Sequence, residues 1–225
     1  MLKNISNLGD AALYCDFGIQ VNKATNLEVI KYFNTIREKK IKGINNLTPS
    51  YNKLIISFDL RVTNFSEIKN KIENLDTTIE QNKNNKKIEV PVCCEENFAL
   101  DKSRLEKKLN LSYQEILTKF FDKEYFCYMT GFIAGMPFLG DIDENLRTQR
   151  LETPRVKVPQ GSVGITEQFA NIYTFDSPGG WNIIGNTPLK VFDDSKEKDP
   201  NLISPGDTII FKQISRQEYK SNNDK

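Results

Sequence analysis

A polar run near the middle of the chain separates two parts of different sequence pattern. Residues 81–87, QNKNNKK, contain no apolar side chain, and such a run is typical of a loop or linker. We therefore predict an N-terminal domain over 1–85 and a C-terminal domain over 86–225. The chain has 225 residues, which is enough for two domains that each bury a core.

The N-terminal domain shows alternating strand and helix patterns. A capping-box pattern at Thr25 and Glu28 precedes a helix whose apolar face includes Val29 and Ile36, and Ser66 heads a second helix. The predicted strands are 11–17, 43–47 and 53–59, with a last strand at 77–80 or 86–92. This order of elements predicts a ferredoxin-like α+β unit.

The C-terminal domain begins with two short helices and continues as short strands punctuated by Gly and Pro. Asp101 is expected to cap the first helix, and Ser112 with Glu115 forms a capping-box pattern before the second. The predicted strands are 125–132, 162–168, 170–176, 181–185, 189–193 and 207–214. Short strands at this spacing predict a closed or nearly closed β-barrel. The tail after Arg216 is expected to fray.

The composition narrows the possible functions. The chain contains no histidine, which excludes catalysis by Ser-His-Asp or Cys-His groups within it and zinc sites built on imidazole. A net charge of +1 gives no reason to expect a nucleic-acid partner, and no apolar stretch approaches the ~20 residues of a membrane helix. We expect no metal site and no membrane association. A cytoplasmic location is expected, with four reduced, inert thiols at Cys15, Cys93, Cys94 and Cys127.

Three segments rich in Gly and Pro carry a family resemblance. They are GFIAGMPFLG (131–140), TPRVKVPQGSVGI (153–165) and SPGGWNIIGNTP (177–188). In these segments the sequence resembles the KipI-like family, also called allophanate hydrolase subunit 1 or the B subunit of 5-oxoprolinase, which is of the carboxyltransferase subdomain C and D type. The resemblance runs from about Gly9 to Ile214. It implies an α+β fold in which a cyclophilin-like β-barrel follows the N-terminal domain.

The resemblance also implies an activity that needs partners. It points to an ATP-dependent 5-oxoprolinase, in which this chain would act with the A subunit and a KipA-like C subunit of that enzyme. The complex would convert 5-oxo-L-proline, ATP and water to L-glutamate, ADP and phosphate. The resemblance implies that the assembled complex binds ATP, either alone or together with Mg. Two alternatives stay open. One is a KipI-like inhibitor of a sensor histidine kinase or a catalytically degenerate subunit, and the other is a urea or allophanate carboxyltransferase component.

The same segments supply the candidate site residues. Arg155 is suited to bidentate anion binding, and Ser162 offers a hydroxyl and a backbone N–H; these two are the catalytic candidates. Trp181 is a candidate wall of the substrate pocket. The other substrate-binding candidates are Gly135, Pro137, Thr153, Pro154, Lys157, Gly179 and Gly180. Each has a structural alternative: Arg155 could pair with an acidic neighbour, for example, and Trp181 could belong to the core.

Two departures from the family pattern leave activity open. Glu95, Glu96 and Asn97 stand where the family has Gly-Gly-Glu, and Phe120 aligns with a family histidine. A loop that needs glycine freedom cannot keep its shape with these residues. We expect Arg155→Ala to leave folding intact and to abolish turnover of the assembled complex.

Overall fold

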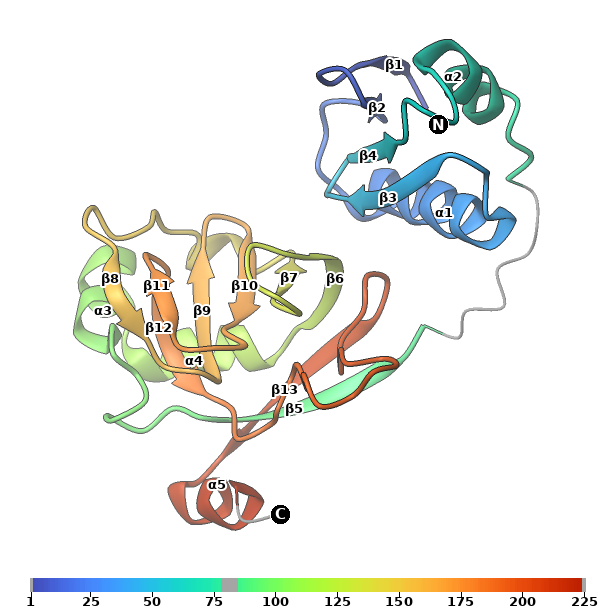
Figure 1. Ribbon diagram of the computed structural model, residues 1–225. Helices are drawn as coiled ribbons and strands as arrows, with labels where there is room; N and C mark the ends of the chain where they lie inside the picture. Colours follow the sequence, from blue (N-terminus) through green and yellow to red (C-terminus); the bar gives the residue numbers. More distant parts are fainter. Residues whose placement is uncertain (1, 78–84, 224–225) are drawn as a thin grey trace. The chain divides into compact units, whose positions relative to one another are not determined.

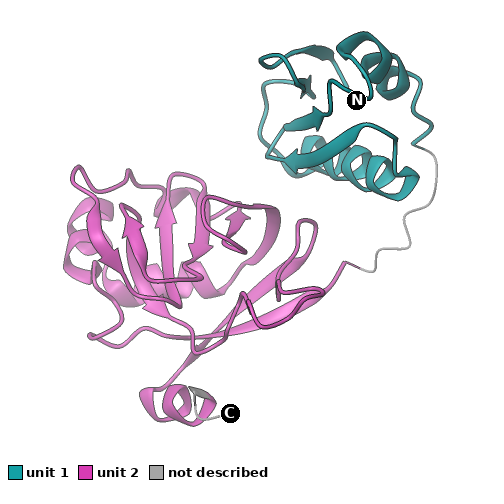
Figure 2. Cartoon of the chain, viewed as in Figure 1, with its two compact units in different colours: residues 1–84 teal, residues 85–225 magenta. Residues whose placement is uncertain are grey.

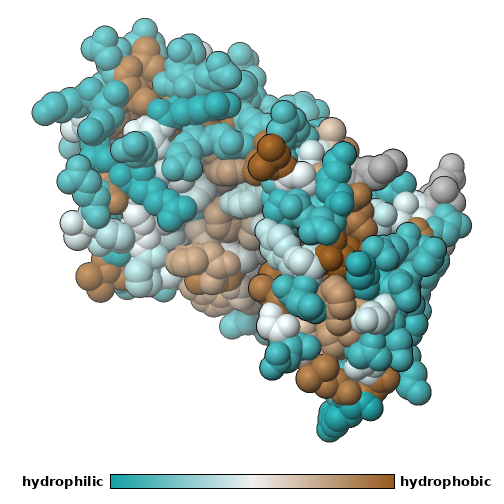
Figure 3. Space-filling view, turned by 90° about the horizontal axis from the view of Figure 1, so that it is seen from above, coloured by the Kyte–Doolittle hydropathy of each residue, from teal (hydrophilic) through white to brown (hydrophobic). Residues whose placement is uncertain are grey.

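The computed structural model describes residues 2–77 and 85–223 and divides into two compact units, Met1–Asn84 and Asn85–Lys225 (Figure 2). The space-filling view shows a mainly hydrophilic surface that apolar residues interrupt in separate patches (Figure 3). Each unit has its own hydrophobic core.

The N-terminal unit is a four-stranded antiparallel sheet with two helices (Figure 1). The strands are β1 (Asn4–Asn7), β2 (Ala12–Asp16), β3 (Ile44–Pro49) and β4 (Lys53–Phe58), and the helices are α1 (Lys23–Lys39) and α2 (Phe65–Glu73). The sheet order is β1-β2-β4-β3. Alternate residues of β2 and β4, such as Leu13 and Ile56, share one core with Val29 of α1 and Ile68 of α2. Both helices therefore cover the same face of the sheet.

The N-terminal sheet differs from the ferredoxin-like expectation in the segment of the chain that forms its edge strand next to β2. Strand β1, which was not predicted from the sequence, occupies the sheet edge next to β2. The expected last strand at 86–92 corresponds to β5 (Lys87–Cys93), which belongs to the second unit. The alternative at 77–80 falls almost wholly outside the described residues. The helix caps also shift, because Asn22 and Asn64 cap α1 and α2 through their side chains instead of Thr25 and Ser66.

The C-terminal unit is a closed seven-stranded barrel, as predicted. Its order is β10-β7-β6-β13-β5-β12-β9, and only the β13–β5 pair is parallel. Beside β5 the strands are β6 (Glu124–Thr130), β7 (Pro137–Gly140), β9 (Ser162–Thr166), β10 (Phe169–Ile172), β12 (Asn182–Asn186) and β13 (Thr208–Ile214). Helices α3 (Lys102–Leu109) and α4 (Tyr113–Phe121) pack into the same core. Phe120 of α4 is fully buried there and stacks on Phe211.

Several elements of this unit differ from the sequence expectation. Residues 189–193 form no strand and contribute only an isolated bridge between Phe192 and Asn201. Two short strands, β8 (Arg155–Val158) and β11 (Ser177–Gly179), pair outside the barrel, and a short 3₁₀ turn, η1, covers Glu144–Leu146.

The tail is a helix, α5 (Arg216–Asn223), and the expectation of fraying was wrong. A reciprocal cap between Ser215 and Glu218 begins this helix. The Tyr219 ring packs on Phe98, and its hydroxyl donates to Asn186 Oδ1 at 2.7 Å.

Candidate binding cavity on the barrel

The outer face of the barrel strands β7, β10 and β12 carries a second, smaller core. Strand alternation sends Leu139 and Ile165 into the barrel, whereas Phe138 and Ile183 point to the outside. The β8–β11 ribbon covers this outer face and contributes Val158 to the small core. The Gly/Pro-rich segments therefore meet here, because each supplies part of this face or its cover.

A small cavity of about 90 Å³ lies in this outer core. Its lining residues are Phe132, Met136, Phe138, Arg150, Tyr173, Gly179, Gly180 and Trp181. Trp181 is 6% exposed, and its ring meets that of Phe138 edge to face, with ring centroids 5.7 Å apart. The walls are thus mainly apolar and aromatic, with few polar groups, which is the usual make-up of a small-molecule site.

Two side chains bring polarity to the cavity. Arg150 is exposed and, among the described residues, has no ion-pair partner. Tyr173 is buried, and this burial raises the pKa of its phenol against the opposing effect of hydrogen bonds from Asn171 and the Trp181 backbone. The phenol therefore stays protonated at neutral pH and is available as a hydrogen-bond donor.

Gly179 is required by the close approach of Tyr173. A Cβ atom at position 179 would lie 2.1 Å from the Tyr173 hydroxyl oxygen. Gly180 is different, because a Cβ there would meet its neighbours at 3.6 Å or more, which is ordinary contact. Of the two predicted glycines, Gly179 is thus the one whose missing side chain shapes the cavity.

Arg155 forms an ion pair within the barrel unit. Its Nη2 donates to Asp101 Oδ1 at 2.6 Å, and Asp101 also accepts the backbone N–H of Ile183 at 2.7 Å. The Asp101 side chain is 4% exposed and that of Arg155 is 26% exposed. Asp101 stands at the predicted cap position of α3, but its carboxylate binds these two groups instead of the helix N–H groups. The structure realises the alternative in which Arg155 pairs with an acidic neighbour.

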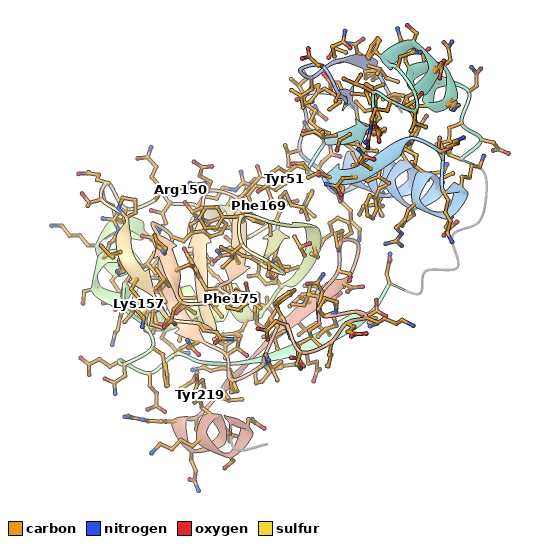
Figure 4. The ribbon with its side chains drawn as sticks, viewed as in Figure 1. Tyr51, Arg150, Lys157, Phe169, Phe175 and Tyr219 are labelled. Atoms are coloured by element: carbon orange, nitrogen blue, oxygen red, sulfur yellow. The ribbon has the colours of Figure 1, made fainter. Side chains whose placement is uncertain are left out.

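Four of the remaining sequence candidates do not line the cavity. Ser162 is buried at the start of β9, where its carbonyl accepts the backbone N–H of Tyr173. Lys157 forms an exposed pair with Asp176 at 2.6 Å, and Figure 4 shows it well apart from Arg150. Thr153 and Pro154 are exposed.

Gly135 and Pro137 shape the loop that carries the cavity residues Phe132 and Met136. Gly135 has φ +69°, and a Cβ there would collide with Phe192, so this position requires glycine. Pro137 is buried where β7 begins, opposite Thr130.

Arg150 and Tyr173 were not among the site residues predicted from the sequence. Tyr173 continues the alternation of the strand that ends at Ile172, so its outward direction could have been inferred from that pattern. Arg150 gives no such signal, because it lies in an irregular segment between η1 and β8.

The cavity does not fit a nucleotide. Its volume of about 90 Å³ is far below the roughly 300–1,000 Å³ of pockets that enclose a whole ligand. Within 2–77 and 85–223, no group of three or more His, Cys, Asp and Glu side chains is arranged to hold a metal ion. No helix in the same ranges is long and apolar enough to cross a membrane.

Comparison with known proteins identifies the family. The model of the carboxyltransferase domain, subdomain C and D, matches residues 3–203. The chain belongs to this family. The resemblance seen in the three Gly/Pro-rich segments is thereby confirmed, and the family match includes all of the residues that line the cavity.

Relatives with curated names were also found. The B subunit of the Bacillus subtilis 5-oxoprolinase is 31% identical over 227 residues, which cover 96% of this chain and 94% of the relative. The B subunit of the Haemophilus influenzae 5-oxoprolinase is 42% identical over 124 residues, 55% of this chain and 58% of the relative.

Solved structures show the same fold. The protein TTHA0988 is 26% identical and superimposes with a TM-score of 0.82 over 92% of this chain, which spans only 40% of the TTHA0988 chain. The urea amidolyase of Kluyveromyces lactis matches 96% of this chain with a TM-score of 0.77, at 16% identity and over 15% of its own length. At that identity the likeness concerns the fold alone.

Proposed function

We propose that this chain is the B subunit of an ATP-dependent 5-oxoprolinase and supplies the pocket for the cyclic amide. The curated relatives that carry this name support the proposal. The observation that carries it is the small aromatic cavity with one cation, Arg150, that has no acidic partner among the described residues. The substrate, 5-oxo-L-proline, is a small ring that bears one carboxylate. The cavity of about 90 Å³ offers an apolar wall for one side of the ring and a guanidinium for the carboxylate, and the partner subunits cover the rest of the ligand.

Each cavity residue then has a defined role. Arg150 binds the carboxylate and fixes the orientation of the ring. Trp181 and Phe138, which contact each other edge to face, form one aromatic wall against the ring and keep water from the apolar side of the cavity. The protonated hydroxyl of Tyr173 offers a hydrogen bond to the lactam oxygen, where negative charge develops as the ring opens.

ATP enters this proposal as a substrate of the assembled complex. Because the cavity is too small for a nucleotide, we assign no residue of the cavity to ATP or to Mg. We propose that the A and C subunits of the enzyme complete the site and provide the nucleotide binding.

The test is turnover by a reconstituted complex. The chain is co-expressed with its candidate A and C subunits, and 5-oxoproline-dependent ATP hydrolysis and glutamate release are measured with and without it. We expect activity that depends on this chain. Arg150→Ala is expected to raise KM for 5-oxoproline by about 10- to 100-fold, because a charge-assisted hydrogen bond to the carboxylate is lost.

Arg147→Ala is the matched control. Arg147 lies three residues before Arg150 and forms a long ion pair with Glu144, with 3.8 Å between the charged atoms. Removing the Arg147 side chain should leave KM for 5-oxoproline unchanged. A complex that turns over equally well without this chain, or with Arg150→Ala, would contradict the proposal. A stable complex without turnover would favour a regulatory or degenerate role, and activity only with a biotin-bearing partner would favour a carboxyltransferase component.

A further inference from the structure

A groove in the N-terminal unit lies apart from the barrel cavity. One hollow of about 550 Å³ lies between the end of α1 and strand β3, and a second of about 580 Å³ lies between the end of α1 and the end of α2. They share Lys40, Ile41 and Lys42, the connector that joins α1 to β3. We call these two hollows together the basic groove.

The charge of the basic groove has one sign. Five cations line it, and its lining contains no Asp or Glu. The cations are Arg37, Lys39, Lys40, Lys42 and Lys71, all of them exposed. None forms an ion pair with another described residue. Because the whole chain carries a net charge of only +1, this concentration of positive charge is local and attracts an anionic partner.

The floor and one side of the groove suit a polypeptide. Partly exposed apolar side chains, among them Phe33, Ile41 and Leu47, line the hollow beside β3. Strand β3 is the last strand of its sheet, and among residues 2–77 and 85–223 no strand pairs with its outer side. Figure 1 shows β3 running along α1. An unpaired edge offers a row of backbone N–H and C=O groups to an incoming strand.

Two features favour a peptide over a nucleic acid or a single small anion. The Arg37 guanidinium lies over the Phe33 ring at 5.2 Å, so that face of the ring is not open for a base to stack on. The two hollows extend from β3 to the end of α2, which is more surface than one phosphate or carboxylate covers.

We propose that the basic groove binds an acidic, extended segment of another protein, which adds to the outer edge of β3. Alternate side chains of that segment would place apolar groups on the groove floor and carboxylates near Lys40 and Lys42. Pro49 at the end of β3 has no N–H, so pairing is limited to the residues before it. The proposal is independent of the proposed oxoprolinase function, because it uses no residue of the barrel.

The probe is a fluorescein-labelled peptide of alternating Glu and Val, titrated into the full chain and followed by fluorescence anisotropy. We expect saturable binding that weakens as salt is added. Lys40→Glu combined with Lys42→Glu should weaken it by at least about tenfold, because two attractions become repulsions. Lys107→Glu combined with Lys108→Glu, which reverses two exposed charges on α3 of the other unit, is the matched control and should change the affinity by less than about twofold.

Two further measurements test the backbone pairing. In ¹⁵N spectra the peptide should shift the amide signals of Asn45, Asn46 and Leu47, and the same peptide N-methylated at alternate positions should not bind. Equal binding of the N-methylated peptide, or an equal loss in the α3 control, would overturn the proposal. So would the absence of saturable binding up to millimolar peptide. Shifts of the same amides by ATP or inorganic phosphate, with none from the peptide, would also overturn it and identify a small-anion site.

Discussion

Replacing Arg155 by alanine is expected to destabilise the barrel unit. The substitution leaves the Asp101 carboxylate, which is 4% exposed, without its cationic partner. The carboxylate keeps the hydrogen bond from the Ile183 backbone N–H at 2.7 Å, but this bond does not neutralise its charge. The structure therefore revises the expectation from the sequence that Arg155→Ala leaves folding intact.

The size of the effect follows from the burial of the pair. Removing one partner of a buried ion pair costs roughly 3–5 kcal/mol. Because Arg155 is 26% exposed, water can reach the vacated space, and we expect the lower end, about 3 kcal/mol. For a domain of this size the corresponding decrease in Tm is about 6–12 °C.

Urea unfolding followed by tryptophan fluorescence measures this effect. Trp181 is the single tryptophan of the chain and is 6% exposed, so its signal reports on the barrel unit alone. Lys157→Ala is the control, because it removes the exposed pair with Asp176, which contributes about 0–1 kcal/mol.

A double-mutant cycle separates the pair from other effects of the substitutions. Asp101→Ala combined with Arg155→Ala should cost less than the sum of the two single variants, because no unpaired buried charge remains. The reasoning is refuted if Arg155→Ala costs no more than Lys157→Ala, or if the two single effects simply add.

Three further expectations concern other positions. Gly179→Ala should lower the free energy of unfolding by about 1–3 kcal/mol, because the new methyl group overpacks against the Tyr173 hydroxyl. The same urea unfolding assay should show a smaller decrease when Tyr173 is also replaced by Phe. Equal decreases with and without Tyr173→Phe would contradict this. The Lys53 ammonium lowers the pKa of Asp16 below its ordinary value of 3.8. The ionised Asp16 carboxylate therefore contributes stability above pH 3.8, and this contribution is lost as the pH falls through the lowered pKa. The free energy of unfolding of Asp16→Asn should accordingly depend less on pH below 3.8 than that of the unsubstituted chain. The same dependence on pH in both proteins would refute this expectation. Phe120→His should cost at least about 2 kcal/mol, because it places an imidazole in a fully buried position; an unchanged urea midpoint would instead mean that the position faces a cleft.

Elements with strong local signals were predicted well. The reciprocal cap of Ser112 and Glu115 is present at the start of α4, and the strand predicted at 162–168 corresponds to the barrel strand β9, Ser162–Thr166. Strands β8 and β11 were missed because they contain only four and three residues. Such short strands have too few residues to show a period and form only because they pair with each other.

The candidate site was predicted in part, because some of its residues lie in a segment with a strong local signal and others do not. Gly179, Gly180 and Trp181 come from one Gly/Pro-rich segment, and all three line the cavity. Arg150 was missed, because a charged residue in an irregular segment carries no information on what it will face.

The sequence by itself determined the two-unit organisation, the barrel and the family, because periodicity, capping residues and Gly/Pro-rich motifs are local properties of the chain. Only the tertiary structure decided which arginine is paired within the protein. Arg155 meets an acid 54 positions earlier in the chain, whereas Arg150, five residues before it, faces the cavity. The pairing of a charged side chain depends on which distant segments the fold brings within a few ångströms, and the spacing of residues along the sequence does not fix that distance.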